Sequence, residues 1–362
     1  METQPHGLRS YIAPGAPATR RPCDGSESSL RVEFGFTPRW YRQRLDIDFS
    51  ERWHADPVYR AKTVTQMRRE LRKQFPDIPI GGDFDAMPAG NLDGAFGALV
   101  VAGIFGVPIE YYQDNWPAAA HAHLSEEQIR AMSTLRLEDS RFFSLLMEQL
   151  DAIEKEFGRI EGYLNWQGVL NNAYRIRGPE ILTDLVINPE LATHLFAIIT
   201  ETMIHGMHLV YARQAATGIV VDHATVSNCL VNMVSPEQYR EFLLPCDQRI
   251  ADAFPRFGVH NCAWKVDPYI RDYAKIKPLD YVDMGLESNL AKAREACPNT
   301  RRALMYTPMA LASNSLERLR ADLRRIHSEL GPCDVVIADI EASTSDERIR
   351  EFWALTKEVA SA

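Results

Sequence analysis

Short apolar segments alternate with helical segments from about residue 78 to the end of the chain, and this alternation restricts the fold more than any other feature. Strands that alternate with helices at this spacing favour a parallel sheet. About seven or eight such units favour a closed (β/α)8 barrel over an open sheet. No G-x-G-x-x-G motif follows a strand, which weakens a dinucleotide-binding alternative. The candidate strands are 78–85, 162–166, 218–228, 257–262, 279–285, 301–308 and 333–341.

We therefore predict an α/β protein built as a (β/α)8 TIM barrel with an N-terminal helical extension. Residues 1–29 are polar and rich in Pro, Ser and Arg, without the apolar core of a signal peptide, so we expect a flexible tail. Residues 30–74 are expected to form the helical extension. Residues 75–362 are expected to form the catalytic barrel.

Charge and cysteine usage exclude several classes of protein. The net charge of -9 argues against a nucleic-acid-binding protein, which would carry a basic surface. The most apolar stretch, 94–109, is too short to span a bilayer, so we expect no membrane association. The six cysteines form no CxxC pair, and this favours a reducing, cytoplasmic setting.

Polar residues at the predicted strand ends are the candidates for chemistry, because active sites of such barrels lie there. His260 and Cys262 end one strand, and residues two apart on a strand face the same way. An imidazole and a thiolate on one face make half of a zinc site. Cys333 precedes its strand, so we expect it on the opposite rim and not as a ligand.

Two carboxylates end the last predicted strand. Asp339 and Glu341 are also two residues apart, and both are oxygen donors that zinc accepts, so one of them is expected as a further metal ligand. We expect Asp339, Glu341 and Asn228 to be catalytic residues. His223 is expected to be a packed barrel residue, and His121 and His123 are expected in an exposed loop. Aromatic and polar side chains expected to line a substrate pocket are Asn165, Trp166, Trp116, Trp264, Tyr306 and Asp283.

The segment "VSPEQYREFLLP" resembles a motif that follows a strand in the uroporphyrinogen decarboxylase superfamily. The segments around it occur in the matching order, and the similarity covers roughly residues 75 to 360. This resemblance implies a (β/α)8 barrel with extra N-terminal helices. The flanking segments are "NWQGVLNNAYRIRGPEILTDLVINPE", "GVHNCAW", "YVDMGLESNLAKAREACP" and "RALMYTPMALASNSLERLRADL".

Two kinds of chemistry occur in that superfamily. The decarboxylases use no metal and have an aspartate where this chain has Asn228, and their Asn-Leu-Asp-Pro stretch is replaced here by "MYTP". The second branch resembles this chain more closely. It comprises zinc methyltransferases that work with corrinoid proteins, with a His-x-Cys motif at this strand end and a third ligand at the end of the last strand. His260 and Cys262 match the motif.

The resemblance thus implies a zinc-dependent methyltransferase. Its methyl group would pass between a small-molecule donor or a thiol acceptor and a corrinoid (cobalamin) on a separate partner protein. A metal-free decarboxylase of a carboxylated substrate is the alternative, with Arg39, Arg42 and Arg44 holding the carboxylates. A third possibility is a non-catalytic protein that binds a corrinoid or a tetrapyrrole.

Overall fold

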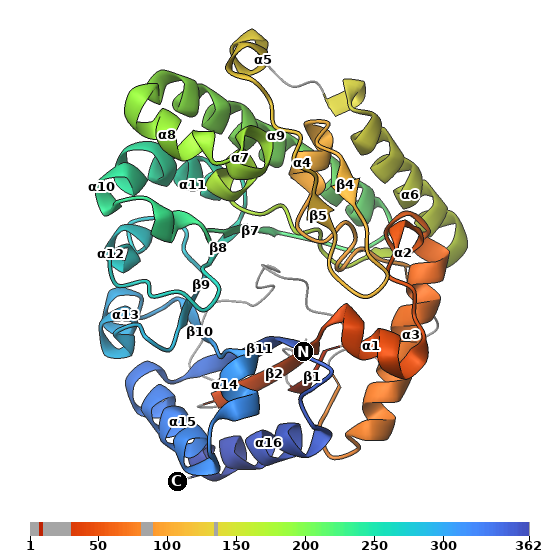
Figure 1. The fold of residues 1–362 in the computed structure, drawn as a ribbon, viewed down its shortest axis with the longest axis vertical. Helices are drawn as coiled ribbons and strands as arrows, with labels where there is room; N and C mark the ends of the chain where they lie inside the picture. The colour runs from red at the N-terminus through yellow and green to blue at the C-terminus, as the bar shows by residue number, and fades with distance from the viewer. Residues whose placement is uncertain (1–6, 10–29, 81–89, 134–136, 362) are drawn as a thin grey trace.

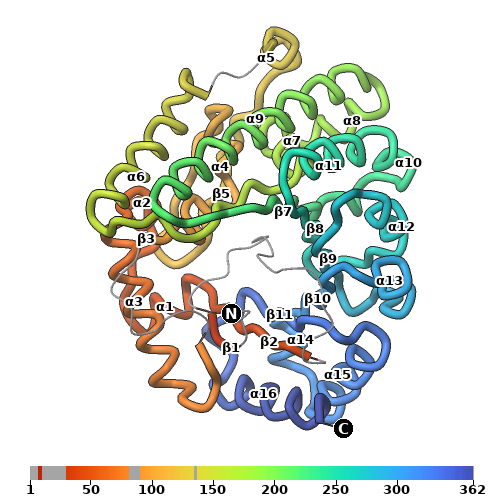
Figure 2. Tube along the Cα trace, turned by 180° about the vertical axis from the view of Figure 1, so that it is seen from behind, coloured from red at the N-terminus to blue at the C-terminus, as the bar shows by residue number. Residues whose placement is uncertain are grey.

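The computed structural model describes residues 7–9, 30–80, 90–133 and 137–361. Seven strands form one parallel sheet in the order β1-β2-β11-β10-β9-β8-β7. A second parallel pair, β3 with β6, lies across the ring from β9 (Figure 2). The predicted TIM barrel is confirmed. The strands are β1 Gly7–Leu8, β2 Leu30–Phe36, β3 Gly90–Asn91, β6 Ile160–Glu161, β7 His223–Ser227, β8 Arg256–His260, β9 Tyr281–Gly285, β10 Arg301–Met305 and β11 Cys333–Ile340.

Helices surround this ring of strands (Figure 1). A small antiparallel pair, β4 Ile109–Glu110 and β5 Ala118–Ala119, lies beside them. The α-helices are α1 Pro38–Leu45, α2 Glu51–Ala55, α3 Pro57–Gln74, α4 Val100–Ile104, α5 Glu126–Ala131, α6 Arg141–Phe157, α7 Val169–Arg177, α8 Glu180–Ile187, α9 Pro189–Ala216, α10 Pro236–Gln238, α11 Leu244–Ala251, α12 Ile270–Tyr273, α13 Leu290–Ala296, α14 Pro308–Ser313, α15 Leu316–Leu330 and α16 Asp346–Ala360.

The N-terminal extension differs from the prediction in its first residues. Residues 30–36 form strand β2, which pairs with β11 from Leu30 opposite Cys333 to Phe34 opposite Ile337. Their alternating Leu, Val, Phe and Phe side chains are buried, and β1 pairs with this strand, so strands of the barrel sheet occur before residue 75. Residues 38–74 contain α1, α2 and α3, as the predicted helical extension requires. Most of the predicted tail, 1–29, and of the first strand candidate, 78–85, lies outside the described residues.

One helix of the described residues, α9, is long and apolar enough to cross a membrane by length and composition. However, 67% of its most apolar window is buried inside the molecule. Gly206 in this helix lies against Trp166, because a Cβ atom at that position would come within 2.7 Å of the indole ring. The helix is thus packed on the barrel through its apolar side chains.

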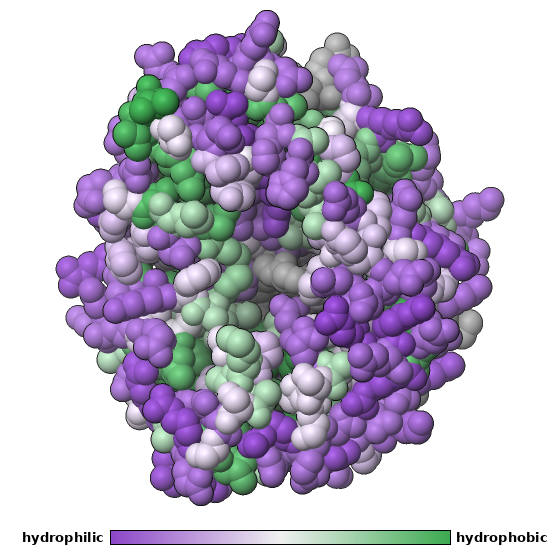
Figure 3. Space-filling view, in the orientation of Figure 1, coloured by the Kyte–Doolittle hydropathy of each residue, from purple (hydrophilic) through white to green (hydrophobic). Residues whose placement is uncertain are grey.

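The register places several strand ends at one rim. Ser227 pairs with His260, and Val259 pairs with Val282, so β7, β8 and β9 finish side by side. Figure 1 views the barrel from this end, with α14, which follows β10, in front. The same face is hollowed near its centre (Figure 3). Cys333 begins β11 and lies on the opposite rim, as predicted.

Candidate metal centre

Three possible metal ligands meet where β7 and β8 end. The donor atoms of Cys229, His260 and Cys262 all lie within 4.8 Å of one another. The two Sγ atoms are 2.8 Å apart, and Nε2 of His260 is 3.1 Å from Sγ of Cys262. In a tetrahedral zinc site with bonds of about 2.3 Å to sulfur and 2.0 Å to nitrogen, two sulfurs lie about 3.8 Å apart and sulfur and nitrogen about 3.5 Å apart, so these side chains would have to move apart by up to about 1 Å to hold one ion. The predicted His260 and Cys262 pair is therefore joined by a third group, Cys229, which the sequence analysis missed.

The backbone brings Cys262 to His260 in an unexpected way. Strand β8 ends at His260, so the pair does not share a strand face as the sequence argument assumed. Cys262 instead has a φ of 57°, in the left-handed region that residues with a side chain seldom adopt. Such a conformation costs roughly 1–2 kcal/mol and tends to occur at functional sites. The turn is also packed closely on β9, because a Cβ atom at Gly285 would lie 1.9 Å from the carbonyl oxygen of Ala263.

Asp283 on β9 fixes the orientation of the His260 ring. Its Oδ2 lies 2.5 Å from Nδ1 of His260, and both side chains are buried. Tyr281 Oη also donates to Oδ2, and the backbone N–H of Asn261 donates to Oδ1. A carboxylate that accepts the Nδ1–H leaves the lone pair of Nε2 free for a metal. Asp283 was predicted to bind substrate, but its carboxylate lies behind the histidine and positions it.

The electrostatics of the three groups are coupled. Burial alone would lower the pKa of His260, but the charge and hydrogen bond of Asp283, with a contribution from Cys229, raise it to about 10. The hydrogen bond from Cys262 lowers the pKa of Cys229 well below its usual value, and the nearby His260 adds to this. The same shared hydrogen bond, together with burial, raises the pKa of Cys262. Without a metal, the two sulfurs therefore share one proton, and a bound cation would displace it.

Neither predicted carboxylate belongs to this three-residue cluster. Asp339 lies at a bulge in β11 with a φ of 60°, so the strand alternation that would place Asp339 and Glu341 on one face is broken. Burial raises the pKa of Asp339 to about 6, Glu341 adds to the rise, and a hydrogen bond from Trp116 and the charge of His260 oppose it. Its Oδ1 is buried without a hydrogen-bond partner among the described residues. Glu341 is exposed.

The sequence profile of the family described as "Uroporphyrinogen decarboxylase (URO-D)" matches residues 86–338, which is more than half of the chain. The chain belongs to the URO-D family. A solved structure named "methyltransferase from Methanosarcina mazei" is similar to this URO-D protein, with 14% sequence identity, 95% of each chain covered and a TM-score of 0.63. At that identity the likeness shows a shared fold. No curated protein matches the sequence.

The candidate metal centre of this URO-D protein opens into a pocket of about 410 Å³. Both sulfurs are half-buried and line it, whereas His260 is buried behind them. The segment after β6 and helix α7 supply Gln167, Asn171, Tyr174 and Arg175. His121 and His123, correctly predicted to be exposed, also line the pocket, so they are closer to the site than the sequence suggested. The remaining lining residues are Ala98, Ala119, Ala120 and Leu230.

Several predicted site residues of the URO-D protein point elsewhere. Asn228 is buried and donates from Nδ2 to Asp247, which also accepts from Tyr239, so its side chain supports β7 and does not face the pocket. Trp166 is fully buried against α9, and Tyr306 donates its hydroxyl to Asp322 on α15. These three side chains are therefore not among the described residues that line the pocket, because strand-end position alone does not separate side chains that face the pocket from those that face the helices.

The other predicted pocket residues lie nearer. Asn165 is buried and accepts hydrogen bonds from the backbone and side chain of Gln167, a pocket-lining residue. Trp116 contacts the site through its hydrogen bond to Asp339. Trp264 directly follows the Cys262 turn and is 51% exposed, so it lies at the mouth rather than inside the pocket.

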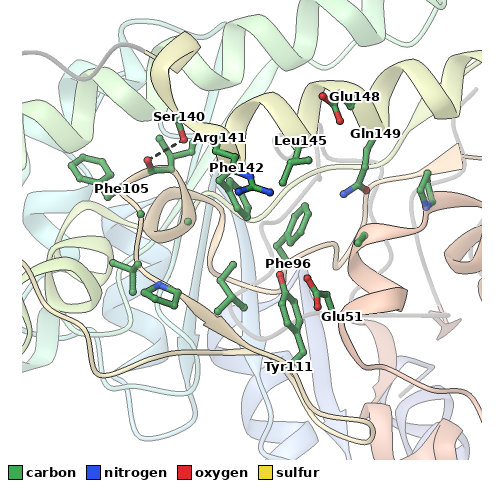
Figure 4. Close-up of a pocket in the computed structure, with 18 of the residues that line it drawn as sticks. Glu51, Phe96, Phe105, Tyr111, Ser140, Arg141, Phe142, Leu145, Glu148 and Gln149 are labelled. Atoms are coloured by element: carbon green, nitrogen blue, oxygen red, sulfur yellow. Dashed lines mark hydrogen bonds between the residues drawn. The ribbon is translucent and has the colours of Figure 1, made fainter.

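A larger pocket of about 730 Å³ lies apart from the metal centre of the URO-D protein. It is formed between α2, the segment around Phe105 and α6, and none of the three ligands lines it (Figure 4). Ser140 closes one side of it by donating to the carbonyl oxygen of Ile104. The aromatic rings of Phe96, Phe142 and Tyr111 face it, with Glu51 and Arg141 nearby.

Proposed function

We propose that this protein is a zinc-dependent methyltransferase that exchanges a methyl group between a small molecule and a corrinoid on a separate protein. The observation that carries the proposal is the convergence of Cys229, His260 and Cys262, with Asp283 behind the histidine. Two thiolates and one imidazole, with a fourth position open to substrate, are a ligand set of catalytic zinc sites. Mixed sulfur and nitrogen ligands favour zinc over magnesium or calcium.

A zinc ion held there would act as a Lewis acid, keeping a bound thiol as thiolate or polarising the leaving group of a methyl donor. The residues of the chain have separate tasks. Asp283 keeps the proton of His260 on Nδ1, so Nε2 faces the ion. Of the two predicted carboxylates, only Asp339 is placed to act on the cluster, since its charge affects the pKa of Cys262. We propose Asp339 as the fourth ligand or as the group that takes the proton of an incoming thiol.

A separate corrinoid protein is part of the proposal, and the surface supports it. Three large apolar side chains are exposed on segments that follow strands: Met233 after β7, Trp264 after β8 and Met309 in α14, which follows β10. All three segments follow the strand ends of the rim that carries the candidate metal centre. Exposed apolar groups gathered around a site are typical of a docking surface. A reducing, cytoplasmic setting would keep Cys229 and Cys262 as free thiols, the state in which they are found.

The alternative, a metal-free decarboxylase, loses its proposed carboxylate-binding arginines. Each of the three already pairs with an acid of this chain: Arg39 with Asp114, Arg42 with Asp46, and Arg44 with Asp346. The arginines therefore serve the N-terminal helical region, and no metal-free site with comparable geometry is found among the described residues.

Metal analysis of the purified protein tests the proposal. We expect about one zinc per chain, which is lost in Cys229→Ala and in Cys262→Ala. Cys333→Ser is the matched control, because this cysteine lies on the opposite rim and should leave the zinc content unchanged. The zinc-loaded parent should also demethylate methylcobalamin in the presence of a small thiol. A parent protein that binds no zinc, or variants that bind it as tightly as the parent, would overturn the proposal.

A further inference from the structure

Arg175 is a cation that the proposed chemistry does not use, although it lines the same pocket as the two sulfurs. It lies in the last turn of α7, and its Nη1 donates to the carbonyl oxygen of Ala98, 2.8 Å away. The rest of the guanidinium makes no hydrogen bond to another described residue that would satisfy its remaining donors. A guanidinium has five N–H donors, so one bond leaves most of its capacity open.

In the part of the chain that the structure describes, Arg175 has no carboxylate partner. Arg177, two residues further along the helix, forms an ion pair with Asp184. No described aspartate or glutamate lies within ion-pair distance of Arg175. Burial lowers the pKa of Arg175 to about 10, and the only charge that opposes this effect is that of Cys229. The residue therefore remains a cation near neutral pH. Partly buried arginines are usually paired, so an unpaired one at a pocket wall marks a place for an anion.

We infer that the pocket binds a small substrate with a single carboxylate, which pairs with Arg175 while its other end reaches the sulfurs of Cys229 and Cys262. The inference depends on the proposed function only for the reaction of the substrate end that reaches the two sulfurs. Arg175 would then be a specificity-determining residue, selecting anionic substrates over neutral ones.

The size and polarity of the pocket favour this class of ligand. A volume of about 410 Å³ suits a small molecule rather than a macrocycle. Three alanines and Leu230 give the wall an apolar character, while Gln167 and Asn171 add neutral polar groups. Arg175 is the only permanent cation among the described residues that line the pocket. One positive charge matches a monoanionic carboxylate, whereas a phosphate dianion would keep an uncompensated charge.

Two thiols of equal length test the inference. Calorimetry would compare 3-mercaptopropionate with 3-mercapto-1-propanol on the zinc-loaded full-length protein, with ethyl phosphate as a dianionic probe. We expect the parent to bind the anionic thiol at least tenfold more tightly than the neutral one, and ethyl phosphate weakly. Arg175→Gln should abolish the preference and Arg175→Lys should retain part of it. The control is Arg213→Gln, a surface arginine that pairs with Asp151 and Glu154 far from the pocket.

The outcomes separate this inference from the proposed function. Equal binding of both thiols by the parent, or an unchanged preference in Arg175→Gln, overturns it. The inference is also overturned if Arg175→Gln loses zinc but keeps the preference for the anionic thiol. That result would show that Arg175 stabilises the thiolates of Cys229 and Cys262. If the parent binds no zinc, the proposed function fails, and the metal-free protein is titrated with propionate and 1-propanol. Propionate must then still bind more tightly, through Arg175, for the inference to hold.

Discussion

Replacing Asp283 by asparagine removes the group that orients His260 while keeping the shape of the side chain. The carboxylate accepts from His260 and Tyr281 at Oδ2 and from the backbone of Asn261 at Oδ1. An asparagine has one oxygen for these two sets of donors, so its NH2 group must face either Nδ1 of His260 or the N–H of Asn261. Either arrangement weakens the support of the metal-binding nitrogen.

Loss of such a partner typically lowers metal affinity by about 10- to 100-fold. This range corresponds to about 1.4–2.8 kcal/mol of binding free energy at 1.4 kcal/mol per tenfold. We therefore expect the zinc Kd of Asp283→Asn to rise by this factor, measured by competition with a chromophoric chelator at neutral pH.

Asp247→Asn is the matched control, because Asp247 is also buried and hydrogen-bonded but contacts Asn228 and Tyr239 instead of a metal ligand. Burial raises the pKa of Asp247 to about 7, so at neutral pH the substitution removes only part of a charge. Thermal melting would show that both variants fold. An Asp283→Asn protein that folds and binds zinc like the parent would refute the orienting role of Asp283.

Three further predictions follow from the geometry. Burial raises the pKa of Asp339 to about 6, so its charged form destabilises the metal-free fold as the pH rises above the unfolded pKa. Asp339→Asn should therefore add about 3 kcal/mol to the free energy of unfolding at pH 7.5 but little at pH 4, measured with urea. Gly285→Ala should displace the Cys262 turn and weaken zinc binding, whereas Gly158→Ala, with open space around it, should not. Trp264→Ser and Met309→Ser should raise the KM for a corrinoid protein while leaving the rate with free methylcobalamin unchanged; equal losses in both assays would contradict a docking role.

The alternation of strands and helices predicted the barrel, and the strand-end rule predicted the neighbourhood of His260 and Cys262, because that rule depends only on the direction of parallel strands. The strand-end rule could also have indicated Cys229. This residue follows a strand that neighbours the His260 strand in sequence, and neighbouring units of such a barrel are adjacent in space, so the two ends had to meet. The sequence analysis instead selected Asn228, one residue earlier, whose side chain donates to Asp247.

The failures come from local backbone conformation. Alternation placed Asp339 and Glu341 on one face, but the bulge in β11 and the positive φ at Asp339 separate them. A positive φ at a non-glycine residue leaves no mark in the sequence, so neither this turn nor that of Cys262 could be predicted. Arg175 could not be recognised either, because whether an arginine on a helix is paired depends on residues far along the chain.

The four groups of the centre are carried by the ends of only three consecutive strands, β7, β8 and β9, and this has an evolutionary consequence. Cys229 and Cys262 follow their strands, His260 is the last residue of β8 and Asp283 lies in the middle of β9, so the helices and the backbone pairing of the strands do not depend on the identity of these side chains. A barrel of this kind can gain or lose its ion by a few substitutions without repacking. Among descendants of one ancestor, metal dependence should therefore change repeatedly. The residues at these three strand ends should indicate it better than overall relatedness.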